Sequence, residues 1–259
     1  MFEGKEIKPL FLLGGYDLEM LTIKNILESV SARYVDYALR WNEACLSRFE
    51  DVFQRYSQFV SYFYGIELRE DIPLPEHYIR IDHHNEYAHL PSALEQIMGL
   101  FGLPLTRRLS LIAANDKAYI PGMLQLGATA EEIASIRQAD REAQGVTEKD
   151  EYLAEKAVRE NKEIVKDLIV IRALSSRFSP ICDRLYPYKR LLIYTDKEWM
   201  YYGEQAYVIK EYFESFFLKG YMFNGGGDNG YLGSRQDVYT SDEIHEMVQQ
   251  IKKLMSYGI

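Results

Sequence analysis

The chain has 259 residues, of which 47% are hydrophobic and 27% charged, a composition typical of a globular protein with a substantial core. Its formal net charge of -9 argues against a long nucleic-acid duplex as a partner, because non-specific binding depends on neutralised phosphates, although a local basic cleft could hold a short strand. Cys45 and Cys182 stand alone, which argues against a disulfide framework or a cysteine-rich zinc site and favours a reducing cytoplasm.

The chain begins with an acidic pair behind a predicted buried strand. Residues 9–13 form an apolar run that a glycine pair closes, and a helix is expected from about 20 to 30. Asp17 and Glu19 lie between the two, where α/β proteins place chemistry at the carboxyl ends of parallel strands. In an extended segment both carboxylates would point to one side, whereas at a helix N-terminus they would favour the helix dipole. The pattern alone leaves both interpretations open.

The rest of the first half alternates strands and helices, and its strands carry or precede polar side chains. Strands are predicted at 32–36, 66–68 and 77–81, and helices at 42–64, 91–101 and 108–114, with a capping box at 129–132. Asp36 ends the first of these strands, Glu67 lies within the second, and Asp82-His83-His84 follows the third. Asp116 is expected in a loop after the helix at 108–114.

Between residues 137 and 166 the sequence is dense in charge and alanine, which indicates a solvated connecting helix. We therefore predict two domains, 1–136 and 167–259. In the second domain the predicted strands are 167–171, 190–194 and 199–202, and the predicted helices are 176–185, 204–217 and 241–255, the last capped by Ser241. The predicted fold class is α/β, with a parallel-sheet N-terminal domain followed by a smaller α/β domain.

Acids and imidazoles thus recur at successive strand ends of the first domain. Clustered without a counter-ion, these acids would repel one another, and each would lose several kcal/mol of solvation. A divalent cation removes that conflict, and a mixed carboxylate and imidazole set suits manganese or another mid-row metal. Taken alone, Asp82-His83-His84 is more typical of a polar loop whose histidines only form hydrogen bonds than of a site. Its place in the series of acids favours a metal site.

These motifs resemble the DHH phosphoesterase superfamily with its associated DHHA1-type C-terminal domain. Asp82-His83-His84 behind an apolar strand is the specific part, and Gly225-Gly226-Gly227 with Gly230 and Gly233 resembles the C-terminal glycine motif. The family includes single-strand exonucleases, nanoRNases, exopolyphosphatases and manganese-dependent inorganic pyrophosphatases. The resemblance implies a metal-dependent phosphoesterase that works by two-metal hydrolysis, with two Mn²⁺ ions expected and Mg²⁺ or another divalent cation as the alternative.

The resemblance also implies a role for individual side chains. The expected metal ligands are Asp17, Glu19, Glu67, His83 and Asp116. The expected catalytic residues are His84, which would face the phosphate, and Asp82, which would orient the histidines. The expected substrate-binding residues are His84, Lys117, Gly225, Gly226, Gly227 and Arg235.

Several positions depart from the family pattern. Gly15 stands where the family has a histidine, Glu19 and Glu67 replace aspartates, and Asp228 stands where a histidine is frequent. The interval from His83 to Asp116 is also shorter than in the family. These departures keep an alternative open, a nucleotide-binding or regulatory protein that retains the fold with an eroded metal site. A third interpretation, a generic α/β fold with a coincidental tripeptide, has the least support.

The predicted partner is a small phosphorylated substrate or a short single-stranded oligonucleotide. Residues 1–9 lack the apolar core of a signal peptide, and no apolar run approaches the ~20 residues of a membrane span. We therefore expect a soluble, cytoplasmic protein without a membrane partner. A homodimer is left open as its assembly.

Overall fold

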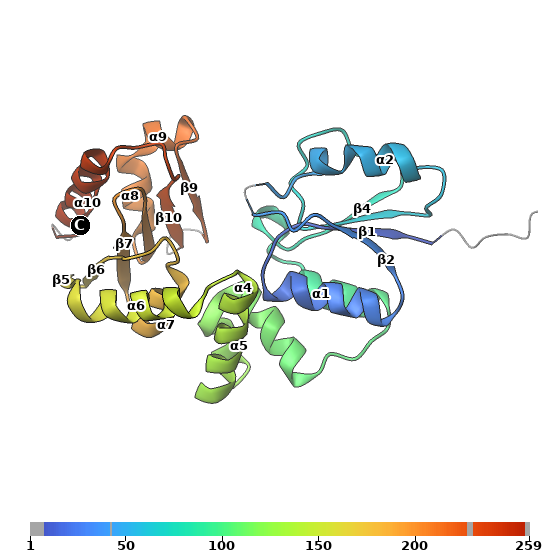
Figure 1. Ribbon diagram of the computed structural model, residues 1–259, viewed down its shortest axis with the longest axis horizontal. Helices are drawn as coiled ribbons and strands as arrows, with labels where there is room; N and C mark the ends of the chain where they lie inside the picture. Colours follow the sequence, from blue (N-terminus) through green and yellow to red (C-terminus); the bar gives the residue numbers. More distant parts are fainter. Residues whose placement is uncertain (1–7, 42, 227–229, 257–259) are drawn as a thin grey trace, which may run out of the picture. The chain divides into compact units, whose positions relative to one another are not determined.

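The computed structural model describes residues 8–41, 43–226 and 230–256, and the chain separates into two compact units, residues 1–145 and 146–259 (Figure 1). Within these described ranges no helix combines the length and the apolar character needed to cross a membrane. The division between the units falls inside the segment 137–166, which the sequence predicts as one connecting helix.

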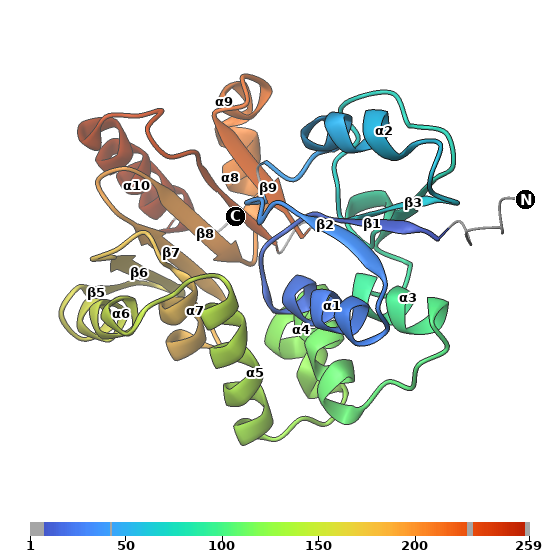
Figure 2. The same ribbon diagram turned by 45° about the vertical axis from the view of Figure 1, so that its right-hand side comes forward.

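The first unit is a four-stranded parallel sheet with helices on both faces. Its strands, in the order β2-β1-β3-β4, are β1 (Leu10–Leu13), β2 (Arg33–Asp36), β3 (Phe63–Ile66) and β4 (Tyr78–Ile81). Its helices are α1 (Leu18–Ser29), η1 (Leu46–Phe49), α2 (Glu50–Tyr56), η2 (Asn85–Tyr87), α3 (Ala93–Leu100), α4 (Arg107–Gln125) and α5 (Ala130–Ala143). Helices α1, α3 and α4 lie on one side of the sheet, and α2 lies on the other (Figure 2).

The central strand β1 is buried on both faces, which explains its uninterrupted apolar sequence. Leu10 and Leu12 pack into the core beneath α2, together with Phe49. Phe11 points to the other face, where its ring stacks on Tyr64 with centroids 4.9 Å apart. Alternate side chains of one strand therefore supply both cores of the unit.

Strand register brings the carboxyl ends of three strands level with one another. Leu13, the last residue of β1, pairs with Ile66 of β3, and Ile66 pairs with Ile81 of β4. The residues that follow these strands, including Glu67 and Asp82, consequently emerge at one edge of the sheet.

The helix predicted over 42–64 is wrong in its second half. The helical region ends with α2 at Tyr56, and Phe63–Ile66 form β3, which is earlier than the predicted strand at 66–68. Tertiary pairing with β1 decides the conformation here, because an aromatic-rich sequence fits a strand as well as a helix. Gly65 lies within the strand rather than ending a helix, and a Cβ on it would overlap the Tyr78 ring.

Two further helix predictions need correction. Helix α4 continues from Arg107 to Gln125, interrupted by non-helical backbone at Ala118 and Tyr119, so Asp116 lies on a helix and not in a loop. In place of one helix over 137–166 there are α5 and α6 (Glu148–Glu160), separated by a turn at Gly145, whose φ is 79°. Glycine adopts this left-handed conformation without strain, which favours a helix end.

The second unit contains a six-stranded mixed sheet in the order β5-β6-β7-β8-β10-β9, in which only β6 and β7 are parallel. Its elements are α6 (Glu148–Glu160), β5 (Lys162–Val165), β6 (Leu168–Arg172), α7 (Ser179–Leu185), β7 (Arg190–Tyr194), β8 (Trp199–Gly203), α8 (Ala206–Tyr212), α9 (Glu214–Leu218), β9 (Met222–Gly225), β10 (Tyr231–Ser234) and α10 (Ser241–Ser256). Helices α6 and α7 pack against one core, and α8 and α10 against another. The predicted fold class, a parallel-sheet α/β unit followed by a smaller α/β unit, is confirmed.

Two details of the second unit differ from the predicted elements. The helix expected over 204–217 is divided into α8 and α9 at Phe213, whose buried ring packs beneath both. Thr240, and not Ser241, caps α10, because its hydroxyl accepts a hydrogen bond from the Glu243 backbone N–H at 3.3 Å.

Candidate metal site

The site is assembled from four segments of the first unit. Glu67 follows β3 directly, and His83 lies two residues after β4. Glu19 lies in the first turn of α1, and Asp116 lies on α4 just before its interruption. Glu67 has a φ of 52°, a left-handed conformation that is uncommon for a residue with a side chain. Residues far apart in sequence therefore meet at the edge where the strands end.

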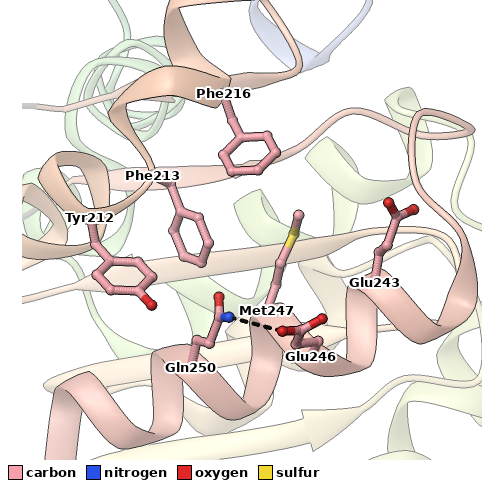
Figure 3. Close-up of a pocket in the computed structure, with 7 residues that line it drawn as sticks. All are labelled: Tyr212, Phe213, Phe216, Glu243, Glu246, Met247 and Gln250. Atoms are coloured by element: carbon pink, nitrogen blue, oxygen red, sulfur yellow. Dashed lines mark hydrogen bonds between the residues drawn. The ribbon is translucent and has the colours of Figure 1, made fainter.

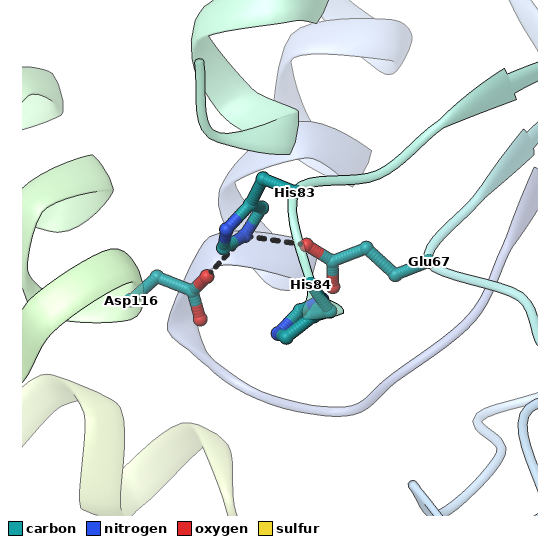
Figure 4. Close-up of side chains that lie close together, drawn as sticks. All are labelled: Glu67, His83, His84 and Asp116. Atoms are coloured by element: carbon teal, nitrogen blue, oxygen red, sulfur yellow. Dashed lines mark ion pairs between the residues drawn. The ribbon is translucent and has the colours of Figure 1, made fainter. Parts of the chain in front are cut away.

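The imidazole of His83 is the centre of this group. Its Nε2 lies 2.7 Å from Asp116 Oδ2, 3.1 Å from Glu67 Oε1 and 3.6 Å from Glu19 Oε2. Figure 4 shows the carboxylates of Glu67 and Asp116 directed at this imidazole from opposite sides. Glu67, His83, His84 and Asp116 each place one potential ligand atom within 4.8 Å of the others.

Several of these polar atoms are buried without a hydrogen-bond partner. They are Glu19 Oε2, both carboxylate oxygens of Glu67, His83 Nε2 and Asp116 Oδ2. Around His83 Nε2 these atoms form ion pairs but no hydrogen bonds of good geometry, and buried polar atoms without such bonds are rare in proteins. Their convergence on one place fits a cation, which would accept a lone pair from each of them. Carboxylate oxygens and an imidazole nitrogen form the donor set expected for a divalent mid-row metal.

The electrostatics of the cluster lead to the same conclusion. Burial, together with repulsion from Asp116, raises the pKa of Glu67 well above its usual range, and burial raises the pKa of Asp116 to about 6. Burial alone would lower the pKa of His83, yet the surrounding carboxylates raise it to about 12. Burial would likewise raise the pKa of Glu19, but His83 outweighs it and lowers that pKa. The cluster holds an excess of negative charge, and a cation would balance it.

His84 lies beside the cluster and is held by Asp82. The side chain of His84 is 40% exposed, and its ring centroid lies 4.3 Å from that of His83. Asp82 Oδ1 accepts a hydrogen bond from the His84 backbone N–H at 2.9 Å and lies 3.0 Å from Nδ1 of the same residue. Burial acts to raise the pKa of Asp82, but these contacts with His84 lower it, so the carboxylate accepts and Nδ1 donates. Asp82 therefore holds the ring of His84 in place, and the catalytic role of both residues stays a prediction.

Asp17 adopts the second of its two predicted arrangements, at a helix N-terminus. Its Oδ1 accepts a hydrogen bond from Met20 N at 2.9 Å and caps α1. Burial, followed by repulsion from Asp116, raises the pKa of Asp17 well above its usual range. Its carboxylate lies close enough to influence the cluster, and its role as a metal ligand stays a prediction.

The sequence did not indicate that α5 supports this site. Asp140 Oδ1 accepts a hydrogen bond from Leu18 N at 3.3 Å, which fixes the start of α1. Arg137 donates to Asp140 Oδ2 at 2.7 Å and to Asn115 Oδ1 at 2.9 Å, next to Asp116. Both charged side chains are buried, although the charge-rich sequence predicted a solvated helix. The only sequence signal was an Arg and an Asp three residues apart, which is common on exposed helices.

Gly14 and Gly15 follow β1, and the chain passes close to neighbouring atoms at both positions. A Cβ on Gly14 would lie 2.4 Å from the carbonyl oxygens of both Ile66 and Glu67. A Cβ on Gly15 would lie 2.6 Å from the indole ring of Trp41, so this ring occupies the space that a side chain at position 15 would need. Gly15 therefore contributes no side chain to the site, and the ring of Trp41 lies against it.

The predicted substrate-binding residues are divided between the two units, and Lys117 and Arg235 each donate a hydrogen bond to a backbone carbonyl. Lys117 follows Asp116 on α4, and its Nζ donates a hydrogen bond to the Leu90 carbonyl. In the second unit Arg235 Nε donates to the Gly220 carbonyl at 2.8 Å, and Gly225 and Gly226 lie at the end of β9. Gly227 and Asp228 lie outside the described residues. Asp36, the acid at the end of β2, forms an ion pair with Lys24, in which Oδ2 lies 2.8 Å from Nζ.

The second unit has a cavity of about 380 Å³ between the aromatic side chains of α8 and α9 and the helix α10 (Figure 3). Tyr212 and Phe216 line one side, and Glu246 and Met247 line the other. The other acidic side chain that lines this cavity, Glu243, accepts hydrogen bonds from Thr240 at the start of α10. Within the described residues, histidine and acidic side chains converge in a metal-binding arrangement only around His83.

Sequence comparison finds no matching protein family and no similar curated protein. Among solved structures, the DHH domain of a member of the s1p family of ribosomal proteins superposes with a TM-score of 0.56 at 13% identity, covering 96% of this chain and 87% of that chain. The chain has the fold of the DHH-domain proteins. This confirms the predicted DHH resemblance at the level of the fold.

Other DHH structures superpose less closely. The pGpG-specific phosphodiesterase PggH from Vibrio cholerae has a TM-score of 0.45 at 11% identity, with coverage of 96% of this chain and 99% of that chain. RecJ from Thermus thermophilus, solved in complex with Mn²⁺, has a TM-score of 0.49 at 11% identity. The match covers 97% of this chain and 52% of RecJ, so the chain spans about half of that protein.

Proposed function

We propose that this protein is a divalent-metal-dependent phosphoesterase, with the site around His83 as its metal centre. The observation that carries the proposal is the convergence of buried carboxylate and imidazole atoms that lack hydrogen-bond partners. Glu19, Glu67, His83 and Asp116 would hold the cation. A bound divalent cation supplies Lewis-acid activation of water and stabilises charge on phosphoryl oxygens.

The chain's own residues prepare the substrate side of this site. With Nδ1 of His84 directed at Asp82, the other ring nitrogen, Nε2, is left to contact a phosphoryl oxygen. Asp82 keeps the ring in that orientation through its contacts with the backbone N–H and Nδ1 of His84. The partial exposure of His84 beside a buried cluster leaves it accessible to a substrate.

The substrate proposed is a small phosphodiester, a short single-stranded oligonucleotide or a polyphosphate, because a net charge of -9 disfavours a long polyanion. Mn²⁺ is the proposed ion. A second ion stays a prediction, with Asp17 as its additional ligand and none available from Gly15. The second unit is proposed as the DHHA1-like substrate-binding domain.

Chelation is the direct test. The purified protein is expected to hydrolyse a dinucleotide and bis(p-nitrophenyl) phosphate in Mn²⁺, to lose the activity in EDTA, and to regain it when Mn²⁺ is restored. Mn²⁺ should also raise the melting temperature, because an ion that binds only the folded state stabilises it by mass action. Activity that is indifferent to chelation would overturn the proposal.

Asp82→Asn tests the support of His84. The amide retains the size of the carboxylate but loses its charge, so its contacts with the backbone N–H and Nδ1 of His84 become weaker and hold the ring less firmly. We expect hydrolysis to fall by roughly 10- to 100-fold, the range found for groups that orient a site, while Mn²⁺ affinity changes little. Asp167→Asn is the matched control, since Asp167 lies in the second unit and is 56% exposed. Equal activity of Asp82→Asn and Asp167→Asn would remove Asp82 from the mechanism.

One observation favours a second function, a non-hydrolysing nucleotide-binding or regulatory protein. Trp41 fills the space beside Gly15, so position 15 offers no ligand. Elemental analysis of the protein after incubation with Mn²⁺ separates the two functions. Stoichiometric metal supports the enzyme, whereas metal-free protein that still binds a nucleotide supports the regulator.

A further inference from the structure

Trp41 lies on the loop between β2 and η1, at the border of the metal site. The benzene ring of its indole rests on Gly15, where a Cβ would approach to 2.6 Å. Its ring also meets the His84 imidazole edge to face, with centroids 5.4 Å apart and an interplanar angle of 66°. Trp41 therefore contacts both the chain that leads to the acidic pair and the histidine proposed to bind phosphate.

The residue is nevertheless 45% exposed. The other tryptophan of the chain, Trp199, is fully buried in the core of the second unit, and tryptophan is on average a highly buried residue. Tyr37, on the same loop, is also exposed but stacks on Phe49 with centroids 4.9 Å apart. Trp41 leaves an aromatic surface open to solvent next to a polar, metal-binding site.

An exposed aromatic ring beside a phosphate-binding group is the arrangement by which proteins hold a nucleotide. The phosphate is bound by charge, and the base stacks on the ring whatever its sequence, because every base has a π-face. A glycine at position 15 lets the indole lie flat against the backbone. Gly15 therefore offers no metal ligand, and because it has no side chain the indole ring of Trp41 can lie beside the site.

We propose that Trp41 is the stacking platform for a nucleobase of the substrate. The inference rests on the proposed function and narrows it, since the substrate then carries a base next to the scissile phosphate and is not an inorganic polyphosphate. Trp41 would distinguish nucleotides from phosphorylated compounds without a base, because stacking adds affinity only for a ligand that has a base.

Tryptophan fluorescence gives a local test, because Trp199 is buried in the other unit and Trp41 is exposed. The probes are adenosine 5′-monophosphate and ribose 5-phosphate, which share a sugar and a phosphate and differ in the base. We expect the first to quench the emission and the second to leave it unchanged. Measured by calorimetry, which does not depend on the fluorophore, Trp41→Ala should weaken binding of adenosine 5′-monophosphate by roughly 5- to 150-fold, the equivalent of a lost stacking contact, and leave ribose 5-phosphate binding unchanged.

Trp41→Phe is the matched variant, since it retains a ring and should keep most of the affinity for adenosine 5′-monophosphate. Equal binding of the two probes by the wild type, or equal affinity of Trp41→Ala and wild type for adenosine 5′-monophosphate, would overturn the inference. Titrations with and without Mn²⁺, and calorimetry of Mn²⁺ itself, separate this result from the proposed function. Failure to bind Mn²⁺ refutes the metal centre, while the comparison of the probes still decides the role of Trp41.

Discussion

His83→Ala is expected to lower Mn²⁺ affinity by at least about 100-fold and to abolish hydrolysis with it. Substitution of groups that merely orient a metal ligand costs roughly 10- to 100-fold, and His83 would itself be a ligand at the centre of the cluster. Its Nε2 lies within 3.6 Å of the carboxylates of Glu19, Glu67 and Asp116, so its loss removes both a donor and the imidazole that these carboxylates share. Calorimetric titration with Mn²⁺ and the hydrolysis assay measure the two effects.

His89→Ala provides the control, because it deletes an exposed histidine of the same segment whose Nδ1 contacts a backbone carbonyl, that of Glu86. Circular dichroism of both variants shows whether the first unit remains folded. Should His83→Ala fold and bind Mn²⁺ as tightly as His89→Ala, the metal centre is elsewhere or does not exist.

The second large effect is expected from Gly14→Ala, on stability and on the site together. The new Cβ would lie 2.4 Å from two carbonyl oxygens and 2.9 Å from the Glu67 carbonyl carbon. These are backbone atoms at the end of a paired strand and cannot rotate away, so the substitution should cost roughly 3 kcal/mol, the upper end of the usual range for overpacking. The melting temperature of the first unit should fall by on the order of 10 °C.

Gly99→Ala is the matched control for this change. Gly99 lies within α3, and a Cβ there would meet nothing within 4 Å. Alanine in a helix is roughly 0.5–1 kcal/mol more favourable than glycine, so this variant should melt at a higher temperature than the wild type. Thermal unfolding measures both shifts in melting temperature, and hydrogen exchange in β1 and β3 shows whether they arise in the first unit, which contains both glycines. A Gly14→Ala protein as stable as Gly99→Ala would show that the strands can separate without cost.

The sequence predicts correctly the elements whose local pattern agrees with their tertiary role. The apolar run at β1, the strand β4 before Asp82 and the capping box at Thr129 all form as predicted. The failures occur where packing overrides the local pattern. The aromatic residues of β3 fit a helix as well as a strand, and only pairing with β1 decides between them.

The candidate site was predictable to the extent that parallel strands end at a common edge. That rule brings Glu67 and His83 together from sequence alone. It says nothing about helices, so it could not place Asp116 on α4 or reveal that Asp140 and Arg137 of α5 support α1. Nor could it find Trp41, because a single tryptophan in a loop has no periodicity that relates it to Gly15.

The backbone of Glu67 bears on the choice between a working and an eroded site. Its φ of 52° suits glycine or asparagine better than glutamate, and its carboxylate is buried among other acids. Strained residues of this kind cost of order 1–3 kcal/mol and persist where the surroundings require them. Without a bound cation, replacement by glycine would relieve both the strain of the positive φ and the repulsion from neighbouring acids. We therefore expect Glu67→Gly to yield a protein that is more stable without metal and that gains no stability from Mn²⁺.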